Sequence, residues 1–208
     1  MTGLSRAPLA RTGFWYLFDY GMVISTAPEP DDWHALQAAT GVDLRSAASP
    51  YWDARESFDA GSVSPEQYWT SVLGWIVSAD EVRRLEALDA AQWSHLNPKT
   101  LAVLETLKGE GAQLALLSNM PPELARRYVA AKTWPGYFSR RYFSGELRLL
   151  KPDPRIFEHV AADLEAEPQD IVFIDDNAAN ISTAQELGFR TVLHTSQTDL
   201  RAELAGLT

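Results

Sequence analysis

Acidic, basic and amide side chains follow short apolar runs at several places in the chain, where they could act together. They are Asp19 after FWYLF (14–18), Ser118 and Asn119 after LALL (114–117), Lys151 in LRLLKPDP, and Asp175 and Asp176 after IVFI (171–174). Carboxylates placed close together resist ionisation unless a cation neutralises them, and hard oxygen ligands suit magnesium. A lysine and a Ser-Asn pair could hold anionic oxygens, while one carboxylate could serve as a nucleophile.

The apolar runs that precede these residues are predicted to be buried strands of a parallel sheet. A further run, TVLH (191–194), predicts a last strand, and helical stripes such as RIFEHVAADLEA separate the runs. This alternation of strands and helices indicates an α/β fold with a doubly wound parallel sheet. Ligands bind beyond the carboxyl ends of the strands in such sheets, so we expect the polar residues to meet at that edge.

Residues 28–97 have a different pattern, in which helices start after short polar segments and no strand is predicted. The helices begin after Pro30-Asp31-Asp32, Ser49-Pro50, Ser64-Pro65-Glu66 and Asp80, because Ser, Asp and Pro favour the first helical turn. The pattern predicts an all-helical domain, 28–97, inserted into an α/β domain formed by 1–27 and 98–208. Five tryptophans of this segment are expected to form its core: Trp33, Trp52, Trp69, Trp75 and Trp93.

Composition excludes several classes of function. The 208 residues carry a formal net charge of −10, which argues against binding to nucleic acids or to anionic membranes. The chain has no cysteine, so disulfides, thiolate catalysis and cysteine-bound metals are excluded. MTGLSRAPLA at the start has no apolar centre, and no run is long enough to span a membrane, so we expect a cytoplasmic protein.

Each polar motif taken alone has a simpler explanation. An Asp after a strand is often a turn former or a helix cap, and Asp175-Asp176-Asn177 could cap the helix that begins near Ala178. Lys151 alone could be a solvated surface residue. A purely structural role for all of these residues is less plausible, because every motif falls at a predicted strand end or in an adjoining loop.

Taken in order, the motifs resemble those of the haloacid dehalogenase superfamily. They are Phe18-Asp19-Tyr20-Gly21-Met22-Val23, Leu117-Ser118-Asn119, Lys151-Pro152-Asp153-Pro154 and Ile174-Asp175-Asp176-Asn177. The resemblance covers nearly the whole chain from about Phe14. It implies a Rossmann-like core, and it implies that residues 28–97 are the cap which this superfamily inserts after its first motif.

The resemblance also implies a role for each matching residue, in a hydrolase that uses Mg²⁺ as its cofactor. Asp19 corresponds to the nucleophile that forms an aspartyl phosphate, Ser118 to the hydroxyl that binds the phosphoryl group, and Lys151 to the lysine that balances charge. The implied metal ligands are Asp19, Asp176, the backbone carbonyl of Gly21, and Asp175 acting through water. We further expect Tyr20, Ser118, Asn119 and Lys151 to contact the substrate, with Arg55 as a specificity contact from the insertion.

Gly21 departs from the pattern of most phosphatases of the superfamily, which have a second Asp at this position as general acid and base. A subgroup with F-D-x-G-x-V in its first motif, including glucose 1-phosphate phosphatase-like members, looks similar. We therefore interpret the chain as a phosphatase of a small phosphomonoester, expected to be a sugar phosphate. The sequence does not indicate an oligomeric state.

Two alternatives remain open at this stage. A haloacid dehalogenase also uses an Asp nucleophile, attacks carbon rather than phosphorus and needs no metal, although the pair Asp175-Asp176 favours the metal-dependent enzyme. The other alternative is a binding protein whose catalytic site has been retired, consistent with the missing general acid. Retention of Asp19, Lys151 and Asp176 argues against this second alternative.

Overall fold

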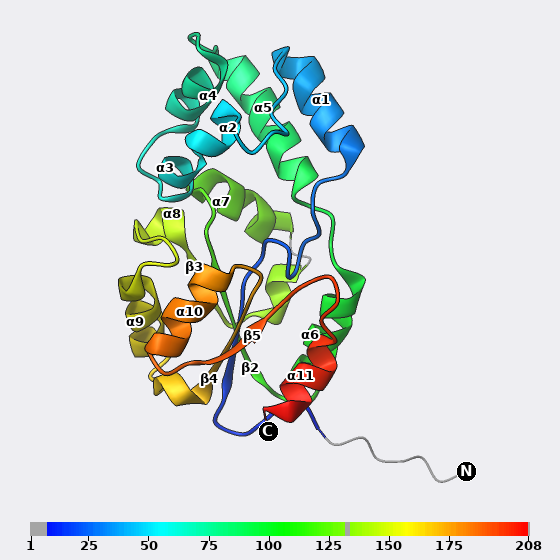
Figure 1. The fold of residues 1–208 in the computed structure, drawn as a ribbon, viewed down its shortest axis with the longest axis vertical. Helices are drawn as coiled ribbons and strands as arrows, with labels where there is room; N and C mark the ends of the chain where they lie inside the picture. Colours follow the sequence, from blue (N-terminus) through cyan, green and yellow to red (C-terminus); the bar gives the residue numbers. More distant parts are fainter. Residues whose placement is uncertain (1–7, 132–133, 208) are drawn as a thin grey trace, which may run out of the picture.

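The computed structural model describes residues 8–131 and 134–207, arranged around one five-stranded parallel sheet (Figure 1). Its strands are β1 (Trp15–Phe18), β2 (Gln113–Ser118), β3 (Arg140–Phe143), β4 (Ile171–Asp175) and β5 (Arg190–Leu193). They lie in the order β3-β2-β1-β4-β5, and every neighbouring pair is parallel. The predicted doubly wound α/β fold is confirmed. MTGLSRAPLA, expected not to be a signal peptide, lies largely outside the described residues.

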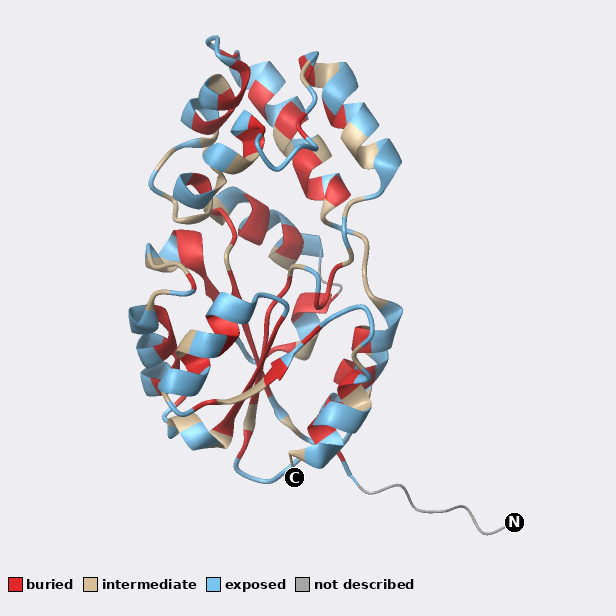
Figure 2. Ribbon diagram, viewed as in Figure 1, coloured by how far each residue is buried: buried red, intermediate tan, exposed pale blue. Residues whose placement is uncertain are grey.

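Helices cover both faces of the sheet, because successive side chains along each strand point to opposite faces. On one face Phe18, Leu116 and Ile174 pack against α6 (Pro98–Gly109) and α11 (Leu200–Gly206). On the other face Leu17 and Phe173 pack against α9 (Pro154–Asp163) and α10 (Ala178–Glu186). Figure 2 shows the resulting buried layer along the strands, with the exposed sides of the helices facing outward.

Strand β3 was not predicted from the sequence. Its residues are Arg140, Arg141, Tyr142 and Phe143, of which the first two are exposed and the last two buried. This strand forms the edge of the sheet, pairing with β2 alone, so its outer half carries charge rather than an apolar run. The short helix α8 (Ser144–Leu147) follows directly, and the 3₁₀ helices are Trp134–Tyr137 and Pro168–Asp170.

Between β1 and α6 the chain forms five helices, at the top of Figure 1, within the fully described segment 28–97 that was predicted to be an insertion and is called the insertion below. Its helices are α1 (Pro30–Thr40), α2 (Pro50–Asp53), α3 (Arg55–Asp59), α4 (Pro65–Leu73) and α5 (Ala79–Gln92). Ser64 and Ser78 cap α4 and α5 with reciprocal capping boxes. Ser64 begins its helix as predicted, whereas α5 starts at Ala79, before the predicted Asp80. The buried core includes Leu36, Tyr51, Tyr68 and Trp69.

Two details of the insertion differ from the sequence prediction. Gly74 adopts a left-handed conformation (φ 78°) that ends α4, so Trp75 lies outside the helix and is 50% exposed. Trp75 is therefore not part of the aromatic core. The segment after Ser49-Pro50 is two short helices rather than one, because Ala54 separates α2 from α3.

The insertion contacts the rest of the molecule where α3 meets α8 and where Tyr128 of α7 (Pro122–Ala131) donates a hydrogen bond to the carbonyl of Ala90 on α5. An isolated antiparallel bridge joins Ser25 to Leu96, at the two places where the chain crosses between the insertion and the rest of the molecule.

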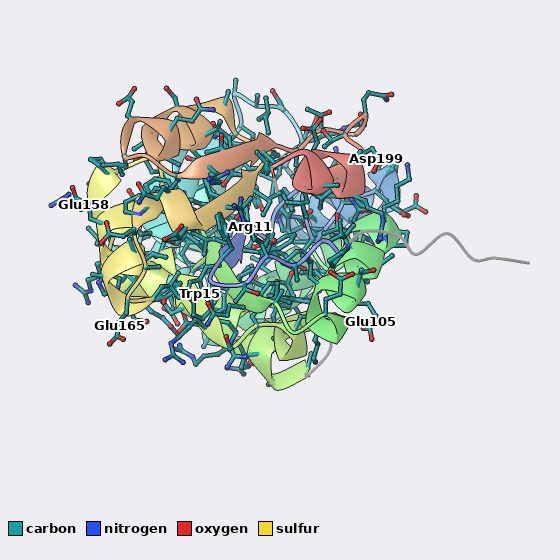
Figure 3. All side chains as sticks on the ribbon, turned by 90° about the horizontal axis from the view of Figure 1, so that it is seen from below. Arg11, Trp15, Glu105, Glu158, Glu165 and Asp199 are labelled. Carbon is teal, nitrogen blue, oxygen red and sulfur yellow. The ribbon has the colours of Figure 1, made fainter. Side chains whose placement is uncertain are left out.

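Viewed from the end opposite the insertion, the labelled acids Glu105, Glu158 and Glu165 lie at the periphery (Figure 3). None of the helices in the described residues is both long and apolar enough to cross a membrane.

Candidate active site

Three charged side chains meet beyond the carboxyl ends of β1 and β4. Lys151 Nζ lies 2.8 Å from Asp19 Oδ1 and 2.6 Å from Asp175 Oδ2. Asp19 follows central strand β1, and its backbone N–H donates to the carbonyl of Ile174 on β4. The parallel register thus places two carboxylates from neighbouring strands side by side, with one ammonium group between them.

Asp175 is held by further hydrogen bonds from the start of α10. The backbone N–H of Asn177 donates to Asp175 Oδ1 at 2.8 Å, and the Asn180 amide donates to both carboxylate oxygens at 3.0 and 3.1 Å. Asn177 also caps α10 by accepting from the N–H of Ala179. Asn180 was not singled out from the sequence, where its only signal is its place in the first turn after the acidic pair.

Asp176 completes a group of carboxylates that suits a cation. Asp19, Asp175 and Asp176 each offer one oxygen, and these oxygens all lie within 4.8 Å of one another. Asp19 and Asp175 are buried whereas Asp176 is exposed, so the group opens on one side. Three oxygen donors without a soft ligand fit a hard cation such as Mg²⁺. Gly21, whose carbonyl was expected to be a further ligand, lies two residues after Asp19 in the loop that follows β1.

The electrostatics of the site show why a cation is favourable here. Burial raises the pKa of Asp19 to about 7, opposed by Lys151 and reinforced by the charge of Asp175. Burial and Asp175 raise the pKa of Asp176 to about 6. The two carboxylates beside Lys151 outweigh its burial and raise the pKa of its ammonium group, which therefore stays charged. One ammonium group faces three carboxyl groups, so the site carries uncompensated negative charge when they ionise.

Ser118 and Asn119 lie at the end of β2, next to β1. Ser118 is 2% exposed. The Asn119 amide donates to the carbonyl of Lys151 at 2.9 Å, and its carbonyl accepts from the Lys151 N–H at 3.0 Å. This pair of bonds fixes the backbone of Lys151 and thereby aims its side chain. Asn119 was expected to contact substrate, whereas in the structure both of its polar groups hold the lysine loop.

Comparison with known proteins agrees with this geometry. Residues 38–188 match the haloacid dehalogenase-like hydrolases, a span well over half of the chain. The chain belongs to the haloacid dehalogenase-like hydrolase family. The matched span contains Ser118, Lys151 and Asp175, and Asp19 precedes it. The expectation of a hydrolase with this superfamily's core is therefore confirmed.

Relatives of this hydrolase in sequence have different activities. It is 30% identical over 120 residues to (S)-2-haloacid dehalogenase 1 of Pseudomonas sp. (strain CBS-3), a match covering 58% of this chain and 52% of that protein. It is 37% identical over 68 residues to D-ribitol-5-phosphate phosphatase of Bacteroides thetaiotaomicron, covering 33% of each. The chain thus spans about half or less of the length of these relatives.

Solved structures show the same fold over almost the whole hydrolase. HAD family enzyme bt-2542 of Bacteroides thetaiotaomicron, in complex with magnesium and inorganic phosphate, has a TM-score of 0.71 at 22% identity, covering 90% of this chain and 96% of that one. L-2-haloacid dehalogenase of Xanthobacter autotrophicus, with chloropropionic acid covalently bound, has a TM-score of 0.63 at 17% identity, covering 92% and 82%. At these identities the likeness establishes the fold.

Two substrate contacts expected in the hydrolase take other positions. Tyr20 is 2% exposed, its ring centroid lies 4.6 Å from that of Trp134, and its hydroxyl donates to the carbonyl of Trp93 in the insertion. Arg55 is directed into the insertion, where it pairs with Asp59 at 2.9 Å and Asp89 at 3.1 Å. Each side chain has a structural partner, and the predicted substrate contact of each stays a prediction.

Two residues that the sequence did not reveal join the insertion to the core of the hydrolase. Ser144 Oγ donates to the carbonyl of Asp59 at 2.6 Å and accepts from the N–H of Met120. Tyr128 donates from its hydroxyl to the carbonyl of Ala90. A serine and a tyrosine in amphipathic segments carry no sequence signal for such contacts, because their partners are backbone carbonyls distant along the chain.

Proposed function

We propose that this hydrolase is a magnesium-dependent phosphatase of a small phosphomonoester. The observation that carries the proposal is the group formed by Asp19, Asp175 and Asp176, with Lys151 between the first two. A single lysine does not neutralise three carboxyl groups, so a divalent cation is needed before an anionic substrate can approach. When bound, Mg²⁺ would offset the negative charge of the carboxylates and of the phosphoryl oxygens.

Each residue of the site has its own role in the proposed reaction. The Asp19 carboxylate attacks phosphorus, the bond from phosphorus to the ester oxygen breaks, and the alkoxide leaves with that electron pair and takes a proton from water. Lys151 stabilises the charge that develops on the phosphoryl oxygens, and Ser118 donates a hydrogen bond to one of them. Water then cleaves the aspartyl phosphate, releasing inorganic phosphate and restoring Asp19. Asn119 and Asn180 position Lys151 and Asp175 respectively.

A sugar or polyol phosphate is the substrate class that we propose. The ribitol-phosphate phosphatase among the relatives supports a hydroxylated substrate. Asp19, Ser118 and Lys151 are 6%, 2% and 5% exposed, so a substrate reaches them only if the covering elements move. We propose that residues 28–97 act as a cap on the domain formed by 1–27 and 98–208, opening at the crossings near 27 and 97.

The proposal is tested by phosphate release from a panel of phosphate esters with Mg²⁺ and after chelation. We expect activity that EDTA abolishes and that added Mg²⁺ restores. Asp19→Asn should remove activity while leaving the thermal midpoint intact, because the amide keeps the size of the side chain. Asp31→Asn is the matched control, since the side chain of Asp31 is fully exposed. Phosphatase activity retained in EDTA or in Asp19→Asn would overturn the assignment.

Haloacid dehalogenase is the second candidate, favoured by the 30% identical relative. In that reaction Asp19 would attack carbon, a halide would leave, and no cation would be needed. Chloride release from (S)-2-chloropropionate in EDTA therefore distinguishes the two functions, because the phosphatase should show none under these conditions. Asp175 favours the phosphatase, since a second buried carboxylate beside Asp19 repels the carboxylate of a haloacid unless a cation intervenes.

A further inference from the structure

Tyr20 directly follows Asp19, the proposed nucleophile, and its side chain reaches the insertion. The Tyr20 hydroxyl donates to the carbonyl of Trp93 at 2.6 Å, at the point where α5 ends. Trp93 is itself tied to the core of the insertion, because its indole N–H donates to the hydroxyl of the buried Tyr51 at 3.1 Å. The residue next to the nucleophile is therefore bonded to the insertion just before the chain returns to the sheet domain.

The backbone of Tyr20 is bonded to the other crossing. Its carbonyl accepts from the N–H of Ile24 at 2.9 Å and from the N–H of Ser25 at 2.8 Å. The two crossings are joined to each other, because the Ile24 carbonyl accepts from the N–H of Asn97 at 2.8 Å. Ser25 also bridges to Leu96, and in Figure 1 the two segments run side by side between the sheet and the insertion. Tyr20 thus contacts both places at which the insertion would pivot.

The ring of Tyr20 has little room to move. The residue is 2% exposed, and its ring centroid lies 4.6 Å from that of Trp134 and 5.1 Å from that of Tyr128. Burial raises the pKa of Tyr20, so its hydroxyl keeps its proton and remains a donor. A displacement of the Trp93 carbonyl therefore either leaves a buried hydroxyl without an acceptor or moves the ring, and with it the backbone beside Asp19.

Tyr128 makes an equivalent bond that does not lead to the carboxylate site. Its hydroxyl donates to the carbonyl of Ala90 at 2.8 Å, in the last turn of α5, and the residue is 6% exposed. Both tyrosine hydroxyls hold the end of the same helix, but Tyr128 belongs to α7 whereas Tyr20 is adjacent to Asp19. The two bonds therefore differ in what they connect to the insertion.

We infer that Tyr20 is a positioning residue, through which the seating of the insertion sets the orientation of the Asp19 carboxylate. Because this role concerns the attack of Asp19 on an ester, it rests on the proposed function. With the insertion seated, the Trp93 carbonyl holds the Tyr20 hydroxyl, and Asp19 Oδ1 lies 2.8 Å from Lys151 Nζ. Opening of the insertion withdraws that carbonyl and loosens the loop after β1, so the nucleophile is correctly oriented only after closure.

Tyr20→Phe and Tyr128→Phe separate positioning of the nucleophile from support of α5. Each variant removes one hydroxyl and keeps the packed ring, so we expect similar falls in the thermal midpoint. With p-nitrophenyl phosphate and Mg²⁺, kcat of Tyr20→Phe should fall about tenfold or more with KM within about twofold of wild type, because a misplaced nucleophile slows the chemical step and leaves ground-state binding intact. Tyr128→Phe should keep both constants within about twofold of wild type. Equal kcat in the two variants would overturn the inference.

Amide hydrogen exchange of the full chain in EDTA tests the coupling without turnover. The N–H of Ser25 donates to the Tyr20 carbonyl, and it should exchange about fivefold or more faster in Tyr20→Phe than in Tyr128→Phe. Equal exchange in the two variants contradicts the coupling. A wild type that releases no phosphate, together with faster exchange in Tyr20→Phe alone, would contradict the proposed function and leave the coupling supported.

A second pair of variants moves the insertion from its far edge and decides the question if Tyr20→Phe does not fold. Gly61→Ala places a Cβ atom 2.5 Å from the carbonyl oxygen of Gly145 in α8, whereas a Cβ atom at Gly74 meets nothing within 4 Å. If the seating of the insertion is transmitted through Tyr20, exchange of the Ser25 N–H should be faster in Gly61→Ala than in Gly74→Ala. Equal exchange in this pair would show that the seating does not reach the loop after β1, and the inference would fail.

Discussion

Gly61 of the helical insertion lies directly against Gly145 of α8. A Cβ atom added at Gly61 would lie 2.5 Å from the carbonyl oxygen of Gly145, and Gly61 has a φ of +66°. Next to this contact Ser144 Oγ donates to the carbonyl of Asp59. The absence of a side chain at Gly61 therefore allows the insertion to seat against the core beside the candidate active site.

Gly61→Ala should hold the insertion away from α8. We expect kcat/KM to fall at least about tenfold, because a misplacement of one ångström at a closing element can cost far more. Gly74→Ala is the matched control: Gly74 has a φ of +78° but nothing within 4 Å of an added Cβ, so it bears the same backbone strain without the clash. Steady-state kinetics of both variants check this, and equal losses would mean that strain rather than seating is responsible.

Arg55 is expected to stabilise the insertion rather than to select the substrate. Its guanidinium pairs with Asp59 and Asp89, whose side chains are 14% and 3% exposed. Arg55→Met leaves these carboxylates buried without their cation, and the free energy of unfolding should fall by about 3–5 kcal/mol. Arg83→Met, which breaks an exposed ion pair with Asp80 on α5, should cost less than about 1 kcal/mol. Urea unfolding measures both, and an Arg55 variant of normal stability with a raised KM would restore the specificity role.

Glu86 should make the stability of the insertion depend on pH. Burial raises the pKa of Glu86 to about 7, opposed by the hydrogen bond from Trp69 Nε1. A carboxyl group whose pKa is raised in the folded state stabilises fully below its unfolded pKa of 4.5 and loses that contribution as pH rises through 7. Wild type should therefore lose up to about 3 kcal/mol between pH 4 and pH 8 that Glu86→Gln does not lose.

The test compares urea unfolding of wild type and Glu86→Gln across this pH range. The glutamine keeps an oxygen that accepts from Trp69, so the difference between the two curves isolates the ionisation. Glu158→Gln serves as the control, because Glu158 is an exposed residue of α9 at the periphery (Figure 3). Parallel curves for wild type and Glu86→Gln would show that the carboxyl group of Glu86 titrates alike in the folded and unfolded states.

The sequence predicted those features of the fold and of the site that depend on neighbouring residues in the chain. Asp19 and Asp175 were predictable because each comes directly after a run of apolar residues, Asp19 just beyond β1 and Asp175 as the last residue of β4, and a parallel sheet brings strand ends together. Strand β3 was missed because exposure at the sheet edge lets Arg140 and Arg141 occupy its first half. Apolar runs therefore identified the three central strands and the edge strand β5, but not the edge strand β3.

The partners of individual side chains were not predictable. Arg55 was expected to contact substrate, and nothing in the sequence shows that Asp89, 34 positions away, takes its charge. Tyr20 follows the nucleophile, but its hydroxyl reaches the carbonyl of Trp93 in the insertion. These pairings depend on how the insertion sits on the core, which is a property of long-range packing rather than of motif spacing.

Gly21 provides the sharpest test of the proposed chemistry, because the chain lacks a general acid at this position. A good leaving group departs without a proton, whereas an alkoxide needs one, and a positioned acid contributes about 10²–10⁴-fold. Wild type should therefore hydrolyse an aryl ester such as p-nitrophenyl phosphate far better than an alkyl ester such as glycerol 3-phosphate. The kcat/KM ratio of the two esters measures this preference.

Gly21→Asp should reduce that preference. A Cβ at Gly21 would lie 3.8 Å from Asp19 Oδ2, an ordinary van der Waals distance, and the backbone there is not left-handed. The added carboxyl group starts beside the nucleophile and keeps the backbone carbonyl, so turnover of the alkyl ester should rise more than that of the aryl ester. Gly21→Asn matches the size without the transferable proton and should raise neither. Equal wild-type rates on both esters would mean that another group, or the substrate itself, supplies the proton.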